Sequence, residues 1–333
     1  MKAVLLTAAG GTEALTFSEI DAPQLTEPDF IRVRLHAAGV NPVDYKMRER
    51  GGIAPANLPI ILGCDGAGVV ETVGKNVTRF HKGDEVYFFN GGIGTEEQGN
   101  YAEYTVIHQD YVAAKPKSLS MTEAAALPLA WITAWEALVD RAKLSEEQPI
   151  LIHAGAGGVG HLAIQLANHL KAVVAVTVSN AEKAAFAKSL GAKYCINYTE
   201  TDFVEEILKI TNGDGVGVVF DTVGGDVFCR SISATRIYGR IVTILESPCD
   251  SDAIKIAKMR NLSLIYELML TPMLEKMHEQ RVAQRIMLEE ASRLVEEGKL
   301  QVKVGHVLPL EEVAEAHHLI EAGHTMGKVV LTI

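Results

Sequence analysis

Apolar and polar residues alternate in the first third of the chain, most regularly over Phe30–Val40. There Ile31, Val33 and Leu35 alternate with polar residues, and a period of two predicts a β-strand with one buried face. Residues 66–74, 84–89 and 101–107 predict further strands, with glycine, proline and asparagine between them. Strands spaced this closely favour a small barrel. The apolar run at residues 3–9 predicts a first strand rather than a signal peptide, because almost no charged segment precedes it.

A different pattern begins near residue 120. Ser120 and Glu123 have the spacing of a capping box that opens a helix, and Pro128 should break or kink that helix. From residue 149 onward strands alternate with helices, and strands that are apolar throughout predict a parallel sheet covered on both faces. Residues 280–297 predict an amphipathic helix with a buried stripe of Val282, Ile286, Leu294 and Val295.

The size and charge of the chain narrow its class. It has 333 residues, more than one hydrophobic core usually holds, so we expect two domains. A formal net charge of −11 disfavours nucleic acid and anionic membrane surfaces as partners. The longest uncharged apolar stretch, residues 124–135, contains Pro128 and is too short to span a bilayer. We therefore expect a small-molecule ligand, with neither nucleic acid nor membrane as partner.

The four cysteines are Cys64, Cys195, Cys229 and Cys249, and none forms a C-x-x-C pair. Their wide spacing predicts neither a disulfide framework nor a zinc cluster. The simplest interpretation is four reduced thiols in a cytoplasmic protein.

The glycine pattern G-x-G-x-x-G occurs once in an informative context. Gly155, Gly157 and Gly160 directly follow an apolar strand and open an apolar helix, which is the setting of a dinucleotide-binding turn. The first glycine allows the tight turn, the second lets a pyrophosphate approach the backbone, and the third permits close packing of helix on strand. The N-terminus of the helix would offer its free N–H groups to the phosphates. An ordinary glycine-rich turn is the alternative.

The end of the next strand bears on the choice between NADH and NADPH. An acidic residue about 20 positions after the glycines would bind the ribose 2′-hydroxyl of NADH. Here the strand ends in Val178, Ser179 and Asn180, with Lys183 one turn into the following helix. This favours the 2′-phosphate of NADPH. Ser179 and Glu182 also have capping-box spacing, so Ser179 could instead be only a helix cap.

Several motifs in the same order resemble the medium-chain dehydrogenase/reductase superfamily, over essentially the whole chain. They are GVNPVDYKMR (39–48), LGCDGAGVVETVG (62–74), KGDEVY (82–87), AGAGGVG (154–160), LGAKYCINY (190–198), VFDTVGG (219–225) and GKVVL (327–331). The resemblance implies an α/β fold in which a Rossmann domain, a doubly wound parallel sheet at residues 125–265, is combined with a GroES-like β-barrel catalytic domain. That catalytic domain would comprise residues 1–124 and 266–333. The family is often dimeric through the edge of the Rossmann sheet, so a homodimer is expected.

The resemblance also addresses zinc. Zinc enzymes of the superfamily carry a ligand cysteine where this chain has Asn41, and a ligand histidine where it has Cys64, followed by Asp65. They also carry a lobe of four closely spaced cysteines, which this chain lacks. Cys64 and Asp65 could ligate a metal in principle, but a catalytic zinc needs three protein ligands. The sequence is therefore similar to the zinc-free branch, which comprises NADPH quinone oxidoreductases of the zeta-crystallin type and related enone reductases.

By this resemblance the cofactor-binding residues fall into groups. Gly157, Gly158 and Val159 would hold the pyrophosphate, with Gly155 and Gly160 shaping the turn. Ser179, Lys183 and Tyr198 would surround the 2′-phosphate, Val223 and Ile244 would flank the ribose and nicotinamide, and Asn41 and Thr133 would line the nicotinamide end. For Tyr198 a packing role, for Thr133 a plain helix position and for Asn41 a turn before Pro42 are the alternatives.

The expected chemistry is hydride transfer from NADPH to a quinone or similar electron-poor carbonyl compound. An enone is the alternative acceptor and would benefit from a general acid, for which Tyr45 is the one candidate. Quinone reductases of this kind commonly have a tyrosine in a stretch corresponding to residues 50–55, which contains none here. An NADPH-binding regulatory or structural protein with little turnover is therefore a third possibility. His153 is expected to be a satisfied core residue or one adjacent to the phosphates, rather than a catalytic base. His317, His318 and His324 are expected to lie on a solvated helix face.

Overall fold

The computed structural model describes residues 1–53, 57–246 and 248–333, and the chain divides into two compact units. Unit 1 comprises Met1–Ile132 and Leu270–Ile333, and unit 2 comprises Thr133–Met269. The expected domain boundaries, after residues 124 and 265, fall a few residues before these. The first boundary between the units lies within α3 (Pro128–Trp135).

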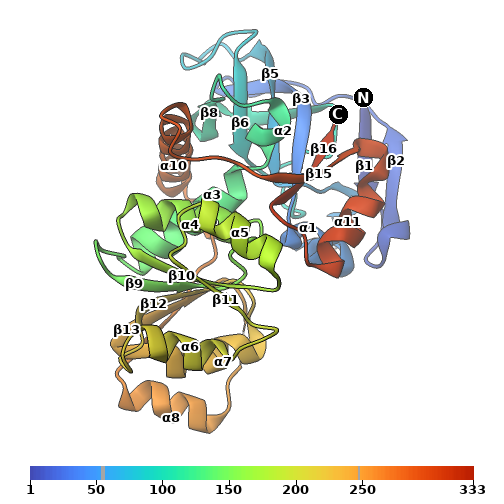
Figure 1. Cartoon of the computed structure of the whole chain (residues 1–333). Coiled ribbons are helices and arrows are strands. Elements are labelled where there is room, and N and C mark those ends of the chain that lie inside the picture. Colours follow the sequence, from blue (N-terminus) through green and yellow to red (C-terminus); the bar gives the residue numbers. More distant parts are fainter. Residues whose placement is uncertain (54–56, 247) are drawn as a thin grey trace. The chain divides into compact units, whose positions relative to one another are not determined.

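Unit 1 consists mainly of antiparallel strands, coloured blue to cyan and red in Figure 1. A small sheet has the order β2 (Leu15–Glu19), β1 (Lys2–Leu6) and β4 (Ile60–Ile61). The larger sheet has the order β15 (Val304–Pro309), β16 (Lys328–Thr332), β3 (Phe30–Val40), β5 (Asp65–Val73), β6 (Glu85–Phe89) and β8 (Val112–Ala114), and β7 (Tyr104–His108) pairs with β3. The alternation predicted for β3 is confirmed, because Ile31, Val33 and Leu35 are at most 2% exposed.

The helices of unit 1 are α1 (Pro42–Arg50), α2 (Met121–Ala125), α9 (Thr271–Leu274), α10 (His278–Glu296) and α11 (Val313–Ala322), with short 3-10 turns at Thr12–Ala14, Gln109–Tyr111 and Leu310–Glu312. The capping box at Ser120 is confirmed, since the Glu123 backbone N–H donates to the Ser120 hydroxyl at 3.2 Å and the Ser120 N–H donates to the Glu123 carboxylate at 2.9 Å. Pro128 ends this helical run and begins α3, as expected. A π-helical segment, Glu136–Arg141, follows α3.

The buried stripe expected for α10 is partly wrong. Ile286 is 53% exposed and Val282 only half-buried, whereas Leu294 and Val295 are buried as expected. The inner face of the helix comprises Arg281, Gln284, Leu288, Ala291, Leu294 and Val295. Arg281 takes an inward position near the start of the helix because the loop at residues 90–97 supplies its partners, Glu97 and Asn90.

Unit 2 is a six-stranded sheet with every paired strand parallel. The strand order is β11 (Tyr194–Asn197), β10 (Val173–Val178), β9 (Pro149–Ile152), β12 (Val216–Asp221), β13 (Thr235–Thr243) and β14 (Ser263–Tyr266). Helices α4 (Gly160–His169) and α5 (Ala181–Ser189) cover one face, and α6 (Phe203–Ile210), α7 (Gly225–Ala234) and α8 (Ser251–Met259) lie on the other (Figure 1). The order runs outward in both directions from β9 and β12, which is the Rossmann arrangement with its switch point between those strands.

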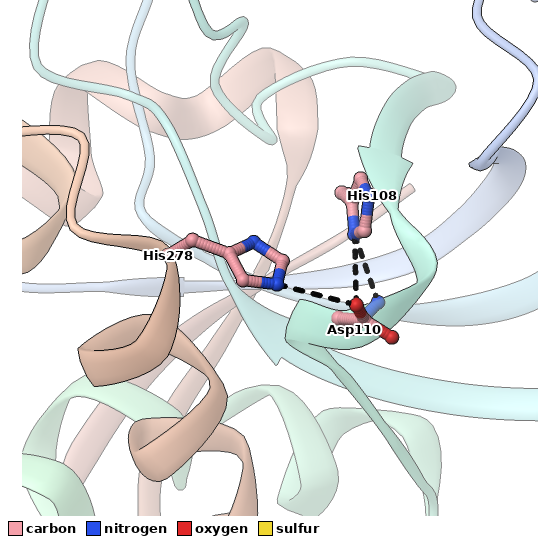
Figure 2. Close-up of side chains that lie close together, drawn as sticks. All are labelled: His108, Asp110 and His278. Atoms are coloured by element: carbon pink, nitrogen blue, oxygen red, sulfur yellow. Dashed lines mark hydrogen bonds and ion pairs between the residues drawn. The ribbon is translucent and has the colours of Figure 1, made fainter.

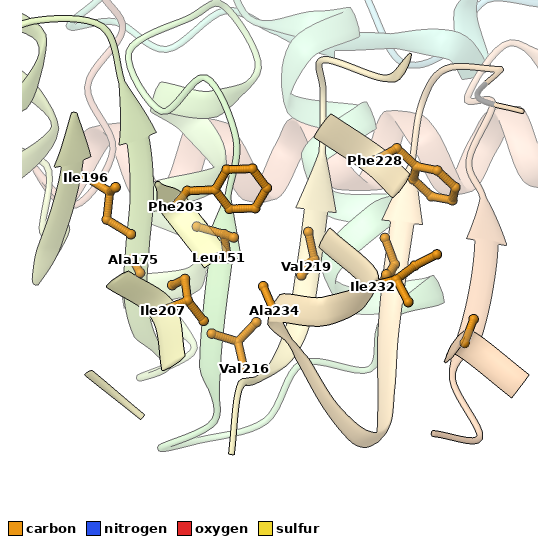
Figure 3. Close-up of a cluster of buried hydrophobic side chains, with 12 residues drawn as sticks. Leu151, Ala175, Ile196, Phe203, Ile207, Val216, Val219, Phe228, Ile232 and Ala234 are labelled. Atoms are coloured by element: carbon orange, nitrogen blue, oxygen red, sulfur yellow. The ribbon is translucent and has the colours of Figure 1, made fainter. Parts of the chain in front are cut away.

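The face of the sheet under α6 and α7 holds a continuous apolar core (Figure 3). Leu151 and Val219 from the central strands meet Ile207 of α6 and Phe228 and Ile232 of α7 there. Ile207 has no exposed surface, and Phe228 is 2% exposed. This packing holds β9 and β12 side by side and therefore sets the spacing of the loops at their carboxyl ends.

The structure corrects the expectation of four reduced thiols. Cys229 and Cys249 form a disulfide, while Cys64 and Cys195 are free. Cys229 lies on α7 and Cys249 immediately precedes α8, and these two helices pack together. Tertiary packing thus joins two cysteines whose spacing in the sequence gives no disulfide signal.

Across the described ranges, no helix combines the length and the apolar character that crossing a bilayer requires.

The core of unit 2 gives a stability test. Ile207→Ala should lower the free energy of unfolding by about 2–5 kcal/mol, because it leaves a cavity that the tightly packed neighbouring side chains cannot fill. Ile256→Ala on α8 is the matched control, since Ile256 is 40% exposed, and it should cost about 1 kcal/mol or less. Urea denaturation monitored by circular dichroism would measure both. Equal losses for the two variants would contradict this account of the core.

Candidate functional site

The glycine-rich turn connects the carboxyl end of β9 to α4 and lies at the switch point of the sheet. A Cβ atom at Gly160 would be only 2.3 Å from the Ala154 carbonyl oxygen, and one at Gly155 would be 2.7 Å from the side chain of Val176 on β10. Both glycines are therefore required by close backbone packing. A Cβ at Gly157 would meet only Ala154, with its nearest atom at 3.2 Å. The turn has the shape that lets a phosphate approach the backbone.

The start of α4 supplies donors. Backbone N–H groups at the start of a helix have no intrahelical acceptor, and α4 starts at Gly160 with Gly158 and Val159 directly before it. No side chain caps this end, because the N-cap residue is Val159. The positive end of the helix dipole adds to the attraction for an anion. The residues present therefore fit the pyrophosphate of a dinucleotide.

The buried His153 helps to hold the glycine-rich turn in place through Thr177. The ring of His153 is 1% exposed, with Nδ1 3.1 Å from the Thr177 hydroxyl and Nε2 2.9 Å from the Ser231 hydroxyl. Burial lowers the pKa of His153 to about 4, so the ring is neutral. The same Thr177 hydroxyl accepts the backbone N–H of Ala154, which has a positive φ of 50°. His153 is thus the satisfied core residue that the sequence predicts.

The end of β10 lies beside that of β11, because the Tyr198 N–H donates to the Val178 carbonyl at 3.1 Å. This places Tyr198, which is 49% exposed, next to the loop that contains Ser179. Ser179 is not the cap of α5, which was the alternative to its role in binding a phosphate. Asn180 is the N-cap and its side chain accepts the Lys183 N–H at 2.9 Å. Ser179 is therefore not the N-cap of α5, and its hydroxyl does not accept the backbone N–H that the cap binds.

The loops after β12 and β13 meet at the same edge of the sheet. Asp221 at the end of β12 is fully buried and accepts the backbone N–H groups of Val223 and Gly224 at 3.1 and 3.0 Å. It also accepts the Thr243 hydroxyl at 2.7 Å, while the Ile244 N–H donates to its carbonyl at 3.3 Å. Asp221 thereby orients the loops that carry Val223 and Ile244. The motif VFDTVGG contained this residue, but only the structure shows its role.

Unit 1 contains a separate buried polar network around Asn41. The Asn41 amide donates to Asp65 Oδ2 at 2.9 Å and its oxygen accepts the ammonium of Lys328. Asp65 Oδ1 also accepts the Leu129 backbone N–H at 2.8 Å, and Lys328 Nζ lies 3.7 Å from Asp65 Oδ2. All three side chains are at most 4% exposed. The network fixes the orientation of the Asn41 amide.

A second carboxyl group extends this network. Asp44 accepts the Asn41 backbone N–H and the Tyr101 hydroxyl, each at 2.8 Å, and the Cys64 thiol lies 3.7 Å from it. Burial outweighs these donors and raises the pKa of Asp44 to about 7. One ammonium, that of Lys328, cannot neutralise two buried carboxylates, so one of them holds a proton readily. The sequence singled out none of Asp44, Tyr101 and Lys328, although two of them lie inside quoted motifs.

The residues at the zinc position of the superfamily do not fit a zinc ion. Burial, with the nearby Asp44 and Asp65 carboxylates, raises the pKa of the Cys64 thiol well above its usual range, so it is protonated and a poor ligand. The oxygens of Asp65 are bound by an amide, a backbone N–H and an ammonium. A divalent ion there would face the positive charge of Lys328 at close range.

Two further candidate residues, Tyr45 and Thr133, lie on helices. Tyr45 lies half-buried on α1, and burial followed by the charges of Glu49 and Glu321 raises the pKa of its hydroxyl. Thr133 is buried on α3. Of the stretch expected to carry a tyrosine, residues 54 and 55 lie outside the described residues.

The expectation of a solvated histidine face on α11 is wrong for His317. Its side chain has no exposed surface, its Nδ1 lies 3.4 Å from the Arg48 guanidinium, and its ring meets the edge of Tyr101. Burial, together with the Arg48 charge, lowers the pKa of His317 to about 3. His318 and His324 are exposed as expected. α11 packs against α1, and this contact, which has no signature in the sequence, covers His317.

The fold and the glycine turn define a dinucleotide-binding oxidoreductase, and comparison with known proteins agrees. Residues 27–117 match the family described as alcohol dehydrogenase GroES-like domain, and residues 190–331 match the one described as zinc-binding dehydrogenase. A quinone oxidoreductase of Pseudomonas aeruginosa is 31% identical over 99% of both chains. A 2-methylene-furan-3-one reductase of Solanum lycopersicum is 34% identical over 99% of this chain and 79% of its own.

Among solved structures, quinone oxidoreductase of Escherichia coli complexed with NADPH matches with a TM-score of 0.87 and 29% identity, over 100% of both chains. The chain belongs to the medium-chain dehydrogenase/reductase superfamily, in its quinone oxidoreductase branch. The resemblance drawn from the motifs is confirmed, as are the Rossmann sheet and the GroES-like domain.

The raised pKa of Asp44 predicts a pH dependence of stability. The pKa of Asp44 is 3.8 in the unfolded chain and about 7 in the folded protein. At a pH between these two values, folded Asp44 keeps a proton that the unfolded chain releases. This contribution to the free energy of unfolding is therefore lost as pH rises through that window, by up to about 1.4 kcal/mol per pH unit. Asp44→Asn has no such proton, so the stability of the variant minus that of wild type should increase from pH 4 to pH 7 and then level off.

Urea denaturation across that pH range would measure the difference. Asp252→Asn serves as the control, because the side chain of Asp252 is 82% exposed, and its difference from wild type should vary little with pH. A flat difference for Asp44→Asn would contradict the raised pKa.

Proposed function

We propose that this chain is an NADPH-dependent, zinc-independent reductase that transfers hydride to a quinone or a similar electron-poor carbonyl compound. The observation that carries the proposal is the glycine turn at the switch point of the parallel sheet, where Rossmann domains hold dinucleotides. NADPH, when bound, supplies the hydride. The chain supplies binding, orientation and exclusion of water.

Each cofactor-binding residue has a proposed task. Gly155 and Gly160 bring the turn close to the sheet, and Gly157, Gly158 and Val159 present backbone to the pyrophosphate. Val223 and Ile244, held by Asp221, border the ribose and nicotinamide. Asn41 and Thr133 remain the residues that the resemblance predicts for the nicotinamide end.

The choice of NADPH rests on the end of β10. The resemblance implies that Ser179, Lys183 and Tyr198 surround the 2′-phosphate there, and the strand ends without the acid that would bind the 2′-hydroxyl of NADH. The Asn180 cap leaves the Ser179 hydroxyl available to a phosphate. The E. coli oxidoreductase with 29% identity is itself complexed with NADPH.

An enone reductase is the second candidate, favoured by the name of the tomato relative, a 2-methylene-furan-3-one reductase. Reduction of an enone requires a proton on carbon. Tyr45 is the group proposed from the sequence, and its raised pKa means that it holds its proton at neutral pH. A Tyr45→Phe variant with full activity on enones would exclude it as the acid.

Zinc independence rests on the network around Lys328. The ammonium lies 3.7 Å from Asp65, the carboxylate beside Cys64, and repels a second cation there. Oxidation of NADPH with naphthoquinone, phenanthrenequinone and simple enones, before and after treatment with a chelator, tests the whole proposal. We expect turnover that the chelator does not diminish. Turnover abolished by the chelator would overturn zinc independence, and tight NADPH binding without any turnover would favour a regulatory protein.

The edge of unit 2 fits a homodimer. β14 is the outermost strand of the sheet, and the exposed side chains near it include Tyr238, Met259 and Tyr266, which are 76%, 82% and 61% exposed. An unpaired strand edge with apolar neighbours is a common association surface. Light scattering after size exclusion should give twice the mass of the chain, and Tyr266→Lys should shift the protein toward the monomer. A wild-type protein that stays monomeric would contradict this arrangement.

Cofactor preference can be tested at Lys183. Lys183→Ala should lower kcat/KM for NADPH about tenfold or more, which corresponds to about 1.4 kcal/mol, and leave kcat/KM for NADH almost unchanged. Lys188→Ala, further along the same helix, is the control and should leave both values unchanged. Initial rates with both cofactors at a fixed quinone concentration would measure the effect. Equal losses with NADPH and NADH would show that Lys183 does not bind the 2′-phosphate.

A further inference from the structure

Two histidines and an aspartate converge in unit 1, apart from the buried network around Asn41 (Figure 2). His108 is the last residue of β7, Asp110 lies in the 3-10 turn that follows, and His278 is the first residue of α10. Asp110 Oδ2 lies 3.7 Å from His108 Nδ1 and 3.5 Å from His278 Nε2. One ligand atom from each residue lies within 4.8 Å of the others.

The contacts of the two rings fix the acceptor role of one His108 nitrogen and allow one for His278. The Asp110 backbone N–H donates to His108 Nδ1 at 3.2 Å, so that nitrogen is an acceptor and its lone pair is directed toward the turn. The other ring nitrogen of His278, Nδ1, lies 2.9 Å from the Tyr111 hydroxyl. When His278 Nδ1 donates to that hydroxyl, Nε2 is left as an acceptor facing Asp110. In that tautomer, His108 Nδ1, His278 Nε2 and the Asp110 carboxylate direct lone pairs toward one another. A cation bound between them would remove the resulting repulsion.

The two neighbouring arginines are bound to other groups and do not pair with the Asp110 carboxylate. Arg281 lies 3.8 Å from the centre of the Tyr111 ring, but its guanidinium is bound to Glu97 and Asn90. Arg285 pairs with Glu289 and gives its Nε–H to the backbone carbonyl of Asp110 rather than to the carboxylate. Within the described part of the chain, the ion pairs recorded for the Asp110 carboxylate are those with the two histidines.

We propose that His108, Asp110 and His278 form a binding site for a zinc ion. Two imidazole nitrogens and one carboxylate oxygen are the ligands that zinc prefers, and water would complete the tetrahedron. Ligand atoms in a tetrahedral zinc site are separated by roughly 3.4 Å, given metal–ligand bonds of about 2.1 Å, and the two separations from Asp110 Oδ2 are 3.5 and 3.7 Å. On binding, the metal takes the lone pair that His108 now gives to the Asp110 N–H. The Tyr111 hydroxyl accepts the Nδ1–H of His278 and orients its ring, as partners of zinc-bound histidines do.

The site would connect two parts of unit 1 that are far apart in the sequence. His108 and Asp110 belong to the first part, Met1–Ile132, and His278 belongs to the second, Leu270–Ile333. A zinc ion bound only in the folded state stabilises that state in proportion to its concentration. This site is chemically separate from the position of Cys64 and Asp65, where Lys328 opposes a metal, so it is independent of the proposed function.

The experiment is a zinc titration of the full-length protein, first freed of metal by a chelator, with a chromophoric competitor as the readout of affinity. Wild type should bind one zinc ion per chain at this site. His278→Ala should weaken binding about 100-fold or more, and Tyr111→Phe, which removes only the outer partner, about tenfold. His278 is the variant of choice because its side chain is 53% exposed, so its removal leaves the core intact.

Two controls locate the ion. His81 and Asp84 form an exposed pair 3.9 Å apart that belongs to no group of three metal ligands among the described residues, so His81→Ala should bind zinc as wild type does. Cys64→Ser should also retain binding. Excess zinc at about 100 times the dissociation constant should raise the Tm of wild type by roughly 4 °C and that of His278→Ala by much less.

The outcomes separate this proposal from the proposed function. Absence of zinc binding at micromolar concentrations, or equal binding by wild type and His278→Ala, would overturn the site. Zinc lost in Cys64→Ser but retained in His278→Ala would overturn it too, and would also contradict zinc-independent catalysis. Zinc lost only in His278→Ala, with NADPH oxidation unchanged by the chelator, is the result that both proposals expect.

Discussion

The close approach of Gly160 to the carbonyl of Ala154 is the constraint on which the function of unit 2 depends. A side chain there would be 2.3 Å from that oxygen, so only glycine lets α4 start directly against the end of β9. The helix N-terminus, the switch point between β9 and β12, and the loops carrying Val223 and Ile244 then share one edge of the sheet. Any residue with a side chain would push the helix away and separate the phosphate donors from the sheet.

In unit 1 the corresponding constraint is the buried positive charge of Lys328. Lys328 extends from β16 to Asn41 and Asp65 in a space that excludes water. A buried ion pair is costly to form, but removing one partner leaves an uncompensated charge that costs more. In zinc enzymes of the superfamily a metal would supply positive charge at this position. Here the ammonium of Lys328, which belongs to the fold, supplies that charge.

Local patterns predicted local features well. The alternation in β3, the capping box at Ser120 and the helix start at Pro128 all depend on residues a few positions apart, and the structure has each of them. The inner face of α10 was predicted less well, because apolar character alone placed Ile286 inside and left Arg281 and Gln284 outside. Arg281 is buried because partners from a distant loop bind it, and periodicity contains no information about such partners.

The sequence by itself determined the order of strands and helices, the glycine turn and the absence of an acid after β10, since each follows from neighbouring residues and from backbone sterics. Only the tertiary structure decided which distant residues meet. It paired Cys229 with Cys249, buried His317 against Arg48, raised the pKa of Asp44, and brought His278 to Asp110. These contacts depend on burial and on the packing of elements far apart in the chain, and both arise only after the strands and helices have been assembled.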